Sequence, residues 1–326
     1  MAKTAFVTGA TGFVGLNLVE HLRGSGWQVI ALRRKHSELG PLTDWGVELV
    51  EGDVTDLRSL RAGLPSQVDA VFHLAGNTSL WTRARSEQMR VNVKGTRNIV
   101  RAALDARAKV LVHVSSIVAY GLHGGTISEQ TPTRGTVSPI HYVRSKSLAE
   151  REVRRGISAG LRSVIVNPAN IIGAYDTHNW ARLFRLVRQG RVPAMPPGGG
   201  SFCHAREVAR VLAVAAEQGR AGHNYLLGGA QATYAELVRR IAAQLGVRRR
   251  VVALPPRLLT GYAQMEEWLA LVFRRDPEIT RETIALLSGN LYCNSRKAQE
   301  ELGYQPLPLE AMLADCHRWL RESGRL

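Results

Sequence analysis

Short apolar runs alternate with amphipathic stretches through the first half of the chain. Apolar runs of strand length occur at residues 5–7, 27–32, 47–50, 69–74, 109–115 and 162–166. Between them, the stretches 13–22, 56–62, 85–105 and 139–156 place apolar residues at helical spacing. Strands that alternate with helices in this way predict an α/β fold, a doubly wound parallel sheet with right-handed crossovers.

The second half loses this alternation and becomes mostly helical. We expect helices over about 180–189, 206–217, 234–245, 257–273 and 308–322, a last strand at 224–227 and a Pro/Gly-rich loop at 193–200. Glu236 follows Thr233 by three residues, which is the capping-box pattern of a helix start. The domains are therefore expected to be a Rossmann-type domain over 1–168, with a returning segment at about 205–228, and a smaller, mostly helical substrate lobe over 169–204 and 229–326.

Composition narrows the class of protein. The 326 residues contain no apolar run of the roughly 20 residues that span a bilayer, so no transmembrane segment is expected. The three cysteines, Cys203, Cys293 and Cys316, form no disulfide framework and no metal pair, which favours a cytoplasmic setting. The formal net charge is +16, but the arginines are dispersed and are not interleaved with aromatic residues, so nucleic acid is not an expected partner.

A glycine-rich turn joins the first apolar run to the first helical stretch. Its sequence is Thr8-Gly9-Ala10-Thr11-Gly12-Phe13-Val14-Gly15, with the glycines in a G-x-x-G-x-x-G spacing. Glycine allows the tight turn and lets backbone N–H groups approach a pyrophosphate. The helix N-terminus that follows adds unpaired donors and the positive end of the helix dipole. Strand, turn and helix together predict a dinucleotide phosphate site.

The residues at the end of the second predicted strand bear on the choice of dinucleotide. An acidic residue there would accept from both adenosine ribose hydroxyls, but this chain has Arg33-Arg34-Lys35. A permanently charged guanidinium suits a 2′-phosphate, so NADP(H) is the expected cofactor, with NAD(H) as the alternative. The competing interpretation is that these are exposed loop charges. Asp53-Val54 follows the third strand, where the carboxylate would either accept from the adenine amine or cap the next helix.

A tyrosine–lysine pair is the second chemical signal. Tyr142 and Lys146 lie four residues apart in the expected helix 139–156 and therefore share a face. An ammonium beside a phenol favours the phenolate, so we expect Lys146 to lower the pKa of Tyr142 and to make it a proton donor or acceptor near neutral pH. Ser115-Ser116 ends a central strand, where a hydroxyl can hydrogen-bond a carbonyl oxygen beside the tyrosine.

Together these motifs resemble the extended short-chain dehydrogenase/reductases, the NAD-dependent epimerase/dehydratase superfamily. The matching motifs occur in the family's order over essentially the whole chain: the turn Thr8 to Gly15, Gly52-Asp53-Val54, His73-Leu74-Ala75-Gly76, Asn92-Val93-Lys94-Gly95-Thr96, Val114-Ser115-Ser116 with Tyr120-Gly121, Tyr142-x-x-x-Lys146, Asn167-Pro168, and Ser295-Arg296-Lys297-Ala298 with Glu301-Leu302-Gly303-Tyr304. The resemblance implies a Rossmann-type fold and hydride exchange with a nicotinamide cofactor.

The resemblance also implies roles for individual residues. Tyr142 is the implied acid/base, Lys146 the residue that holds the nicotinamide ribose, and Ser116, rather than Ser115, the one that orients the reacting oxygen. The expected cofactor-binding residues follow the strand ends: Gly9, Thr11, Gly12, Phe13, Val14, Arg33, Arg34, Asp53, Val54, Leu74, Ala75, Gly76, Tyr142, Lys146 and Pro168. The substrate end is expected at Asn77, Thr78, Ser116 and Asn167, and Asn92 is either structural or part of a water relay. No metal site is expected.

Residues next to the catalytic motifs help to distinguish among the reactions that the family performs. The sugar 4,6-dehydratases of this family carry an Asp-Glu pair directly after the catalytic hydroxyl residue. This chain has Ile117 and Val118 at those positions. Neither side chain can move a proton, so dehydration is not expected. The segment Val164 to Gly173 is closer to dihydroflavonol-reductase-like proteins and to the hopanoid-associated sugar epimerase group. We therefore expect an NADP(H)-dependent oxidoreductase of a ketone, aldehyde or secondary alcohol. The alternatives are an NAD(P)-dependent epimerase of a sugar or sugar nucleotide, and a cofactor-binding regulator without turnover.

The lobe and the long helices suggest the partners. A fairly apolar small-molecule substrate is suggested by the lobe's aromatic residues, unless helical spacing makes them core: Trp180, Phe184, Phe202, Trp268 and Phe273. The helix 257–273 could lie on a membrane, but we expect it to cover the pocket with a hydrophobic inner face. Many relatives pair subunits through the helices that correspond to 85–105 and 139–156, so the resemblance implies a homodimer.

Overall fold

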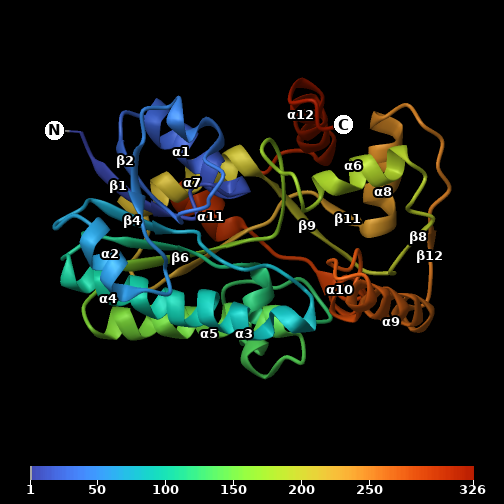
Figure 1. Cartoon of the computed structure of the whole chain (residues 1–326), viewed down its shortest axis with the longest axis horizontal. Coiled ribbons are helices and arrows are strands. Elements are labelled where there is room, and N and C mark those ends of the chain that lie inside the picture. Colours follow the sequence, from blue (N-terminus) through green and yellow to red (C-terminus); the bar gives the residue numbers. More distant parts are fainter. Residues whose placement is uncertain (1) are drawn as a thin grey trace.

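A seven-stranded parallel sheet lies at the centre of the computed structural model, which describes residues 2–326 (Figure 1). The strand order is β10-β6-β5-β4-β1-β2-β3. The strands are β1 (Thr4–Thr8), β2 (Gln28–Arg33), β3 (Glu48–Glu51), β4 (Ala70–His73), β5 (Leu111–Val114), β6 (Ser163–Pro168) and β10 (Asn224–Leu227). The first six strands follow the Rossmann order, and β10 from the second half extends the sheet next to β6. The predicted doubly wound fold is confirmed.

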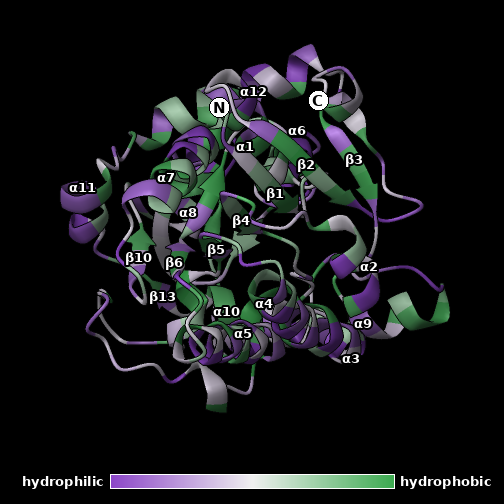
Figure 2. Cartoon of the chain, turned by 90° about the vertical axis from the view of Figure 1, so that its left-hand side faces the viewer, coloured by the Kyte–Doolittle hydropathy of each residue, from purple (hydrophilic) through white to green (hydrophobic). Residues whose placement is uncertain are grey.

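Helices cover both faces of this sheet. The two faces follow from the alternation of side chains along each strand: Ala5 and Val7 pack with one set of helices, and Phe6 packs with the other. One face is covered by α1 (Phe13–Gly24) and α7 (Ala205–Gln218), and the opposite face by α2 (Leu57–Gly63), α4 (Thr96–Asp105) and α5 (His141–Ser158). Double coverage explains why the inner strands β1, β4, β5 and β6 are mostly apolar rather than alternating, whereas β3 at the edge of the sheet is Glu48-Leu49-Val50-Glu51 and less buried; Figure 2 shows the sheet between its helices.

The helix expected over 85–105 contains a change of winding. It runs as α3 (Arg85–Gln88), the π-helical segment η3 (Met89–Gly95) and then α4. Asn92 lies in the π-helical turn, where its Oδ1 accepts from the Asn77 backbone N at 2.7 Å and its Nδ2 donates to Ser145 Oγ at 2.9 Å. Such turns are rare and occur mostly within longer helices, often near functional sites. The apolar spacing of the sequence gave no sign of it.

The second half contains more strand than expected. A four-stranded sheet is formed by β7 (Asn170–Ile172), β9 (Gly199–His204), β11 (Gln231–Thr233) and β13 (Asn290–Leu291), and a two-stranded one by β8 (Ala194–Met195) and β12 (Val252–Ala253). The expected loop at 193–200 is therefore wrong in part, because β8 and the start of β9 lie in it. Gly199 and Gly200 serve close packing, since a Cβ on Gly200 would lie 2.6 Å from Asn170 Nδ2.

The remaining helices and turns complete the chain. The helices are α6 (Ala181–Arg188), α8 (Tyr234–Gln244), α9 (Pro256–Val272), α10 (Arg281–Leu287), α11 (Arg296–Leu302) and α12 (Leu309–Glu322). Short 3-10 turns are η1 (Gly40–Thr43), η2 (Thr82–Ala84), η4 (Ile117–Tyr120) and η5 (Gly135–Val137). Thr233 Oγ1 accepts from Glu236 N at 3.1 Å, which confirms the predicted helix cap. Within residues 2–326, no helix combines the length and the apolar character needed to cross a bilayer.

The aromatic residues of the lobe do not gather in one place. Phe184 and Phe202 are fully buried in a core built mainly by α6, α8 and α12, and Trp180 stacks on Tyr234 with ring centroids 5.5 Å apart. Trp268 and Phe273 are 61% and 67% exposed on α9 and just beyond it. The expected hydrophobic inner face of this helix is therefore wrong: most of its large apolar side chains point outward, and its buried positions are Ala263, Glu266, Glu267 and Ala270. Cys203, Cys293 and Cys316 are all buried.

Candidate functional site

The glycine turn between β1 and α1 is packed tightly against the end of β4. Gly9 has a φ of +74°, and a Cβ there would lie 2.6 Å from the Ala75 backbone N. A Cβ on Gly15 would collide with the Gly9 carbonyl oxygen. Gly12 begins α1 without any side-chain cap, so the first-turn N–H groups at Phe13 and Val14 are available to an anion. The turn thus fits a dinucleotide pyrophosphate.

Arg33 ends β2 and is held from two sides. Its Nη1 lies 3.3 Å from Glu51 Oε2 and donates to the Lys35 carbonyl at 3.3 Å. Its Nε is buried and has no partner among the described residues. A buried donor without a partner is costly. An additional acceptor at this point, such as a ligand phosphate, would satisfy it. Arg34 is exposed, and its side chain makes no hydrogen bond or ion pair within residues 2–326.

Asp53 and Val54 follow β3. The Asp53 carboxylate accepts from Thr55 N at 2.7 Å, and the following helix is capped by Asp56 instead. Burial works against the charged Asp53, but hydrogen bonds from Thr55 and the charges of Arg90 and Arg34 outweigh it, so the pKa of Asp53 is lowered. Asp53 therefore stays ionised at the edge of the sheet and makes a local turn, not the helix cap. Val54 is buried.

The end of β4 brings the glycine turn close to helix α5. Thr8 Oγ1 accepts from Ala75 N at 3.3 Å, which ties β1 to the segment Leu74-Ala75-Gly76. A Cβ on Gly76 would lie 3.4 Å from Asn92 Oδ1 and 3.8 Å from Lys146 Nζ. The segment that the sequence assigns to the cofactor therefore runs directly past the lysine that it assigns to the nicotinamide ribose.

Lys146 is buried beneath the carboxyl ends of the strands. Its Nζ donates to the Val114 carbonyl at 3.0 Å. Burial lowers its pKa to about 8, and the carboxylate of Glu150 partly opposes that shift. Lys146 is thus mostly an ammonium at neutral pH and loses its charge under mildly alkaline conditions.

Tyr142 lies one helical turn before Lys146 and next to Ser116. Burial raises the pKa of Tyr142 to about 12, and hydrogen bonding with Ser116 acts in the opposite direction. The expectation that Lys146 lowers this pKa is therefore wrong, because desolvation of the phenol dominates. The phenol stays protonated near neutral pH, which suits a proton donor.

The two adjacent serines have different surroundings. Ser115 is buried and donates to Glu150 Oε1 at 2.6 Å. Ser116 is partly exposed, and its Oγ accepts weakly from Val118 N at 3.3 Å while it starts η4. Of the two hydroxyls, only that of Ser116 therefore lies beside Tyr142 with bonding capacity to spare.

The residues expected at the substrate end separate into two groups. Thr78 is exposed, and Asn77 is partly buried with its Oδ1 accepting from Ser79 N at 2.9 Å. Asn167 is fully buried, and its Nδ2 donates to the Ser116 carbonyl at 3.0 Å and to Glu150 Oε1 at 2.6 Å. Asn167 therefore braces the backbone of Ser116 from behind instead of facing the substrate, and the neighbouring Pro168 is buried as well.

Glu150 belongs to the candidate site, although none of the motifs in the sequence includes it. It is buried and accepts from Ser115, Asn167 and, through Oε2, from Asn224 Nδ2 at 3.1 Å. It lies four residues after Lys146 and eight after Tyr142, on the same face of α5. The repeated spacing of three chemical residues on one helix face was the signal that could have found it.

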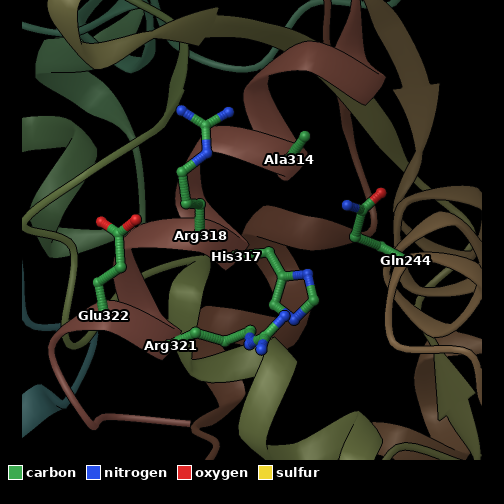
Figure 3. Close-up of a pocket in the computed structure, with 6 residues that line it drawn as sticks. All are labelled: Gln244, Ala314, His317, Arg318, Arg321 and Glu322. Atoms are coloured by element: carbon green, nitrogen blue, oxygen red, sulfur yellow. The ribbon is translucent and has the colours of Figure 1, made fainter.

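A pocket of about 620 Å³ opens elsewhere, between α8 and α12. Figure 3 shows its lining: Gln244, Ala314, His317, Arg318, Arg321 and Glu322. Arg318 and Arg321 point away from each other, and none of the residues expected to bind cofactor or substrate lines it. This is a surface depression apart from the candidate site.

The positions of the glycine turn and of Ser116, Tyr142 and Lys146 are typical of one class of protein. A glycine turn at the Rossmann switch point, with a serine, a partly buried tyrosine and a buried lysine beside it, is the arrangement of an oxidoreductase that uses a dinucleotide. The chain belongs to the NAD dependent epimerase/dehydratase family, whose model matches residues 5–228. It is an enzyme, as the relatives of this family are.

Individual relatives align over nearly the full chain. "Sterol demethylase protein B" from Methylococcus capsulatus is 34% identical and covers 99% of this chain and 100% of its own length. The "4-hydroxy-2-methyl-3-oxo-4-farnesyl-3,4-dihydroquinoline-1-oxide ketoreductase" of Stigmatella aurantiaca is 31% identical, covering 92% of this chain and 91% of its own. The crystal structure of gox2253 superimposes with a TM-score of 0.86 at 34% identity and covers 99% of both chains.

Proposed function

We propose that this enzyme is an NADP(H)-dependent oxidoreductase that interconverts a ketone or aldehyde and the corresponding alcohol, with Tyr142 as the acid/base. The observation that carries the proposal is the partly buried phenol of Tyr142, which lies beside Ser116 and one helical turn before Lys146, and whose pKa burial raises to about 12. A group that holds its proton at neutral pH is matched to protonating an oxygen as hydride arrives at the adjacent carbon.

The cofactor would be held by the strand ends. Its pyrophosphate would lie on the α1 N-terminus, its 2′-phosphate against Arg33 and Arg34, and its nicotinamide ribose beside Lys146. When bound, the nicotinamide supplies or accepts the hydride. The buried, unpaired Nε of Arg33 supports the 2′-phosphate, and the glycine turn supports the pyrophosphate.

The protein's own residues orient the substrate and move a proton. Ser116 Oγ donates to the carbonyl oxygen and Tyr142 transfers its proton to that oxygen, so one hydride and one proton convert the carbonyl to the alcohol. Solvent then returns the proton to Tyr142, and Lys146 would hold the nicotinamide ribose throughout. Asn167 donates to the Ser116 carbonyl, and the charge of Glu150 favours the ammonium form of Lys146.

The surroundings of Tyr142 favour an apolar substrate. Tyr142 packs against a cluster of buried apolar residues that includes Ile117, Leu226, Leu286 and Leu291. Two relatives are named for large apolar compounds, one for a sterol and the other for a farnesylated quinoline. A carbonyl or carbinol on an apolar skeleton is therefore the substrate class we propose.

Replacement of the phenol tests the chemistry. We expect Tyr142→Phe to lower turnover of NADPH with a panel of apolar ketones and aldehydes by about 10²- to 10⁴-fold, since a general acid is lost. Binding of NADPH, followed by fluorescence, should persist. Tyr175→Phe is the matched control, because its hydroxyl bonds only to the exposed Glu20. Unchanged turnover in Tyr142→Phe would remove this tyrosine as the acid.

The charge at the end of β2 tests the cofactor. We expect Arg33→Asp to shift the ratio of NADPH to NADH affinity toward NADH by about tenfold or more, because a charge-assisted bond to the phosphate is replaced by repulsion. Arg188→Asp on the exposed side of α6 controls for the change in net charge. Equal ratios in Arg33→Asp and the native enzyme would contradict the role of Arg33.

One observation favours the second candidate, an epimerase that retains NAD. Glu51 lies 3.3 Å from the Arg33 guanidinium and partly neutralises it. An NAD-dependent epimerase would carry tightly held NAD after purification and would invert a sugar carbon without net consumption of cofactor. Mass spectrometry of the purified protein for NAD and a stoichiometric assay for NADPH oxidation separate the two reactions.

A further inference from the structure

Helix α9 turns its apolar side chains to solvent and its acidic side chains to the protein, the opposite of an ordinary surface helix. Seven large apolar side chains on α9 and at its end are exposed, and we call them the α9 face: Leu258, Tyr262, Met265, Trp268, Leu271, Val272 and Phe273. Leu258 is 65% exposed, Trp268 61% and Phe273 67%. Residues 258, 262, 265, 268 and 272 follow helical spacing, so they form one stripe. Exposed apolar stripes of this kind mark interaction sites.

The acidic residues of the same helix point inward. Glu266 and Glu267 are both buried, and each is paired with an arginine that follows α9. Glu266 accepts from Arg275 at 2.6 and 3.1 Å, and Glu267 accepts from Arg281 Nε at 2.9 Å. These are the only carboxylates in residues 256–275. The α9 face therefore carries no exposed negative charge of its own.

Cations stand at both ends of the stripe. Arg257 lies in the first turn of α9 and Arg274 follows Phe273; both are exposed, and neither has a carboxylate within 4 Å in residues 2–326. Tryptophan and tyrosine favour the boundary between apolar and aqueous surroundings, and arginine favours anionic headgroups. The chain as a whole carries a net charge of +16. Apolar area framed by free arginines is complementary to an anionic lipid surface.

From this we propose that the α9 face docks the enzyme onto the surface of an anionic lipid bilayer. The helix lies on the bilayer and does not cross it, because its opposite side is bound to the protein through the two glutamate–arginine pairs. A second copy of the chain fits this surface less well. A symmetric contact would bring the arginines at both ends of the two stripes together and oppose like charges.

The docked helix lies close to the candidate active site. Arg281 links α9 to α10, and Glu282 of α10 accepts from the His141 backbone N at 3.2 Å, where α5 begins. Tyr142 is the next residue of α5. Figure 1 shows α9 and α10 together at one end of the molecule. Docking thus holds α10, which contacts the start of α5, near the lipid, and the proposal stands whatever reaction the enzyme performs.

Vesicle sedimentation tests the proposal with the full-length protein. We expect binding to vesicles of phosphatidylcholine and phosphatidylglycerol, and much weaker binding to phosphatidylcholine alone. The double variant Met265→Glu, Trp268→Glu should bind the anionic vesicles at least about a hundredfold more weakly. Arg257→Gln, Arg274→Gln should lose about tenfold or more on anionic vesicles only, because an arginine near such a surface contributes about 1 kcal/mol.

Val137→Glu is the matched control, because Val137 is 83% exposed on η5 and lies outside α9. Thermal melting and dinucleotide binding of every variant establish that it is folded. The proposal is overturned if the native protein does not bind anionic vesicles, or if the α9 double variant binds them as the native protein does. It is also overturned if the native protein is a dimer that the α9 variant dissociates and neither protein binds lipid.

Discussion

Glu150 is the single residue that links the most parts of the candidate site. Its two oxygens accept from Ser115, Asn167 and Asn224, and its charge raises the pKa of Lys146 against the effect of burial. Asn167 in turn donates to the Ser116 carbonyl. The carboxylate thus supports Ser116 through Asn167 and favours the charged form of Lys146.

We expect Glu150→Gln to move the alkaline limit of turnover to lower pH. Without the negative charge the pKa of Lys146 falls below about 8, so the ammonium is lost earlier as the pH rises. The new amide also faces the Asn224 amide, donor against donor, which should cost about 1–3 kcal/mol of unfolding free energy. Profiles of kcat against pH and urea unfolding measure the two effects.

Glu152→Gln provides the comparison on the same helix. Glu152 is equally buried, but its partners Arg97 and Arg155 have exposed side chains, so its loss should cost less than about 1 kcal/mol and leave the pH profile in place. If Glu150→Gln and Glu152→Gln show the same profile, Glu150 is merely structural.

For single residues, the sequence predicts which side chains form the site better than it predicts their pKa and burial. The spacing of Tyr142 and Lys146 and the position of Ser116 follow from local patterns, and the structure brings these residues together. The pKa of Tyr142 did not follow, because it depends on burial by segments far along the chain such as Leu226 and Leu286. Asn167 was assigned to the substrate for the same reason: its buried partners come from α5 and β10.

Among the elements, the β1–α1 turn tolerates side chains least, because backbone atoms lie where a Cβ on Gly9 or Gly15 would be. We expect Gly15→Ala to weaken dinucleotide binding by at least about tenfold and to destabilise the fold by about 1–3 kcal/mol, since the new methyl group collides with the Gly9 carbonyl oxygen. Calorimetric titration with NADPH and thermal unfolding measure both.

Gly24→Ala tests whether the effect belongs to the turn. Gly24 ends the same helix and has open space around its Cβ position, so alanine should stabilise by up to about 1 kcal/mol and leave binding unchanged. Comparable loss of binding in both variants would mean that any glycine replacement in α1 disturbs the fold.

Elements buried on both sides were predictable, and those decided by distant contacts were not. The inner strands of the central sheet were recognisable in the sequence as nearly continuous apolar runs, because both faces of the sheet are covered there. The two-residue strands β8 and β12 form only by pairing with each other, and the π-helical turn at Asn92 is stabilised by Asn77 and Ser145. The outward stripe of α9 breaks the rule that apolar means inside, so pattern alone placed it wrongly.

For the whole molecule, the oligomeric state remains a prediction. We expect a homodimer that pairs through α4 and α5, and we expect Leu104→Arg to convert it to monomers at micromolar concentration. The reason is charge: Arg97 and Arg101 already line this surface with Leu104, and two more guanidinium groups would face each other across the symmetry axis. Light scattering after gel filtration measures the mass. Leu307→Arg, at an exposed leucine outside α4 and α5, should leave it unchanged.

The pairing of β10 with β6 has a consequence for how the chain is made. During synthesis, residues 1–168 emerge with six strands, and the backbone of β6 then forms an open edge. That edge stays open until residues 224–227 have left the ribosome, together with α7, which covers one face of the sheet. The nascent chain therefore passes through an interval of more than fifty residues in which an apolar parallel edge is exposed, and a fragment that stops at Pro168 would retain it permanently.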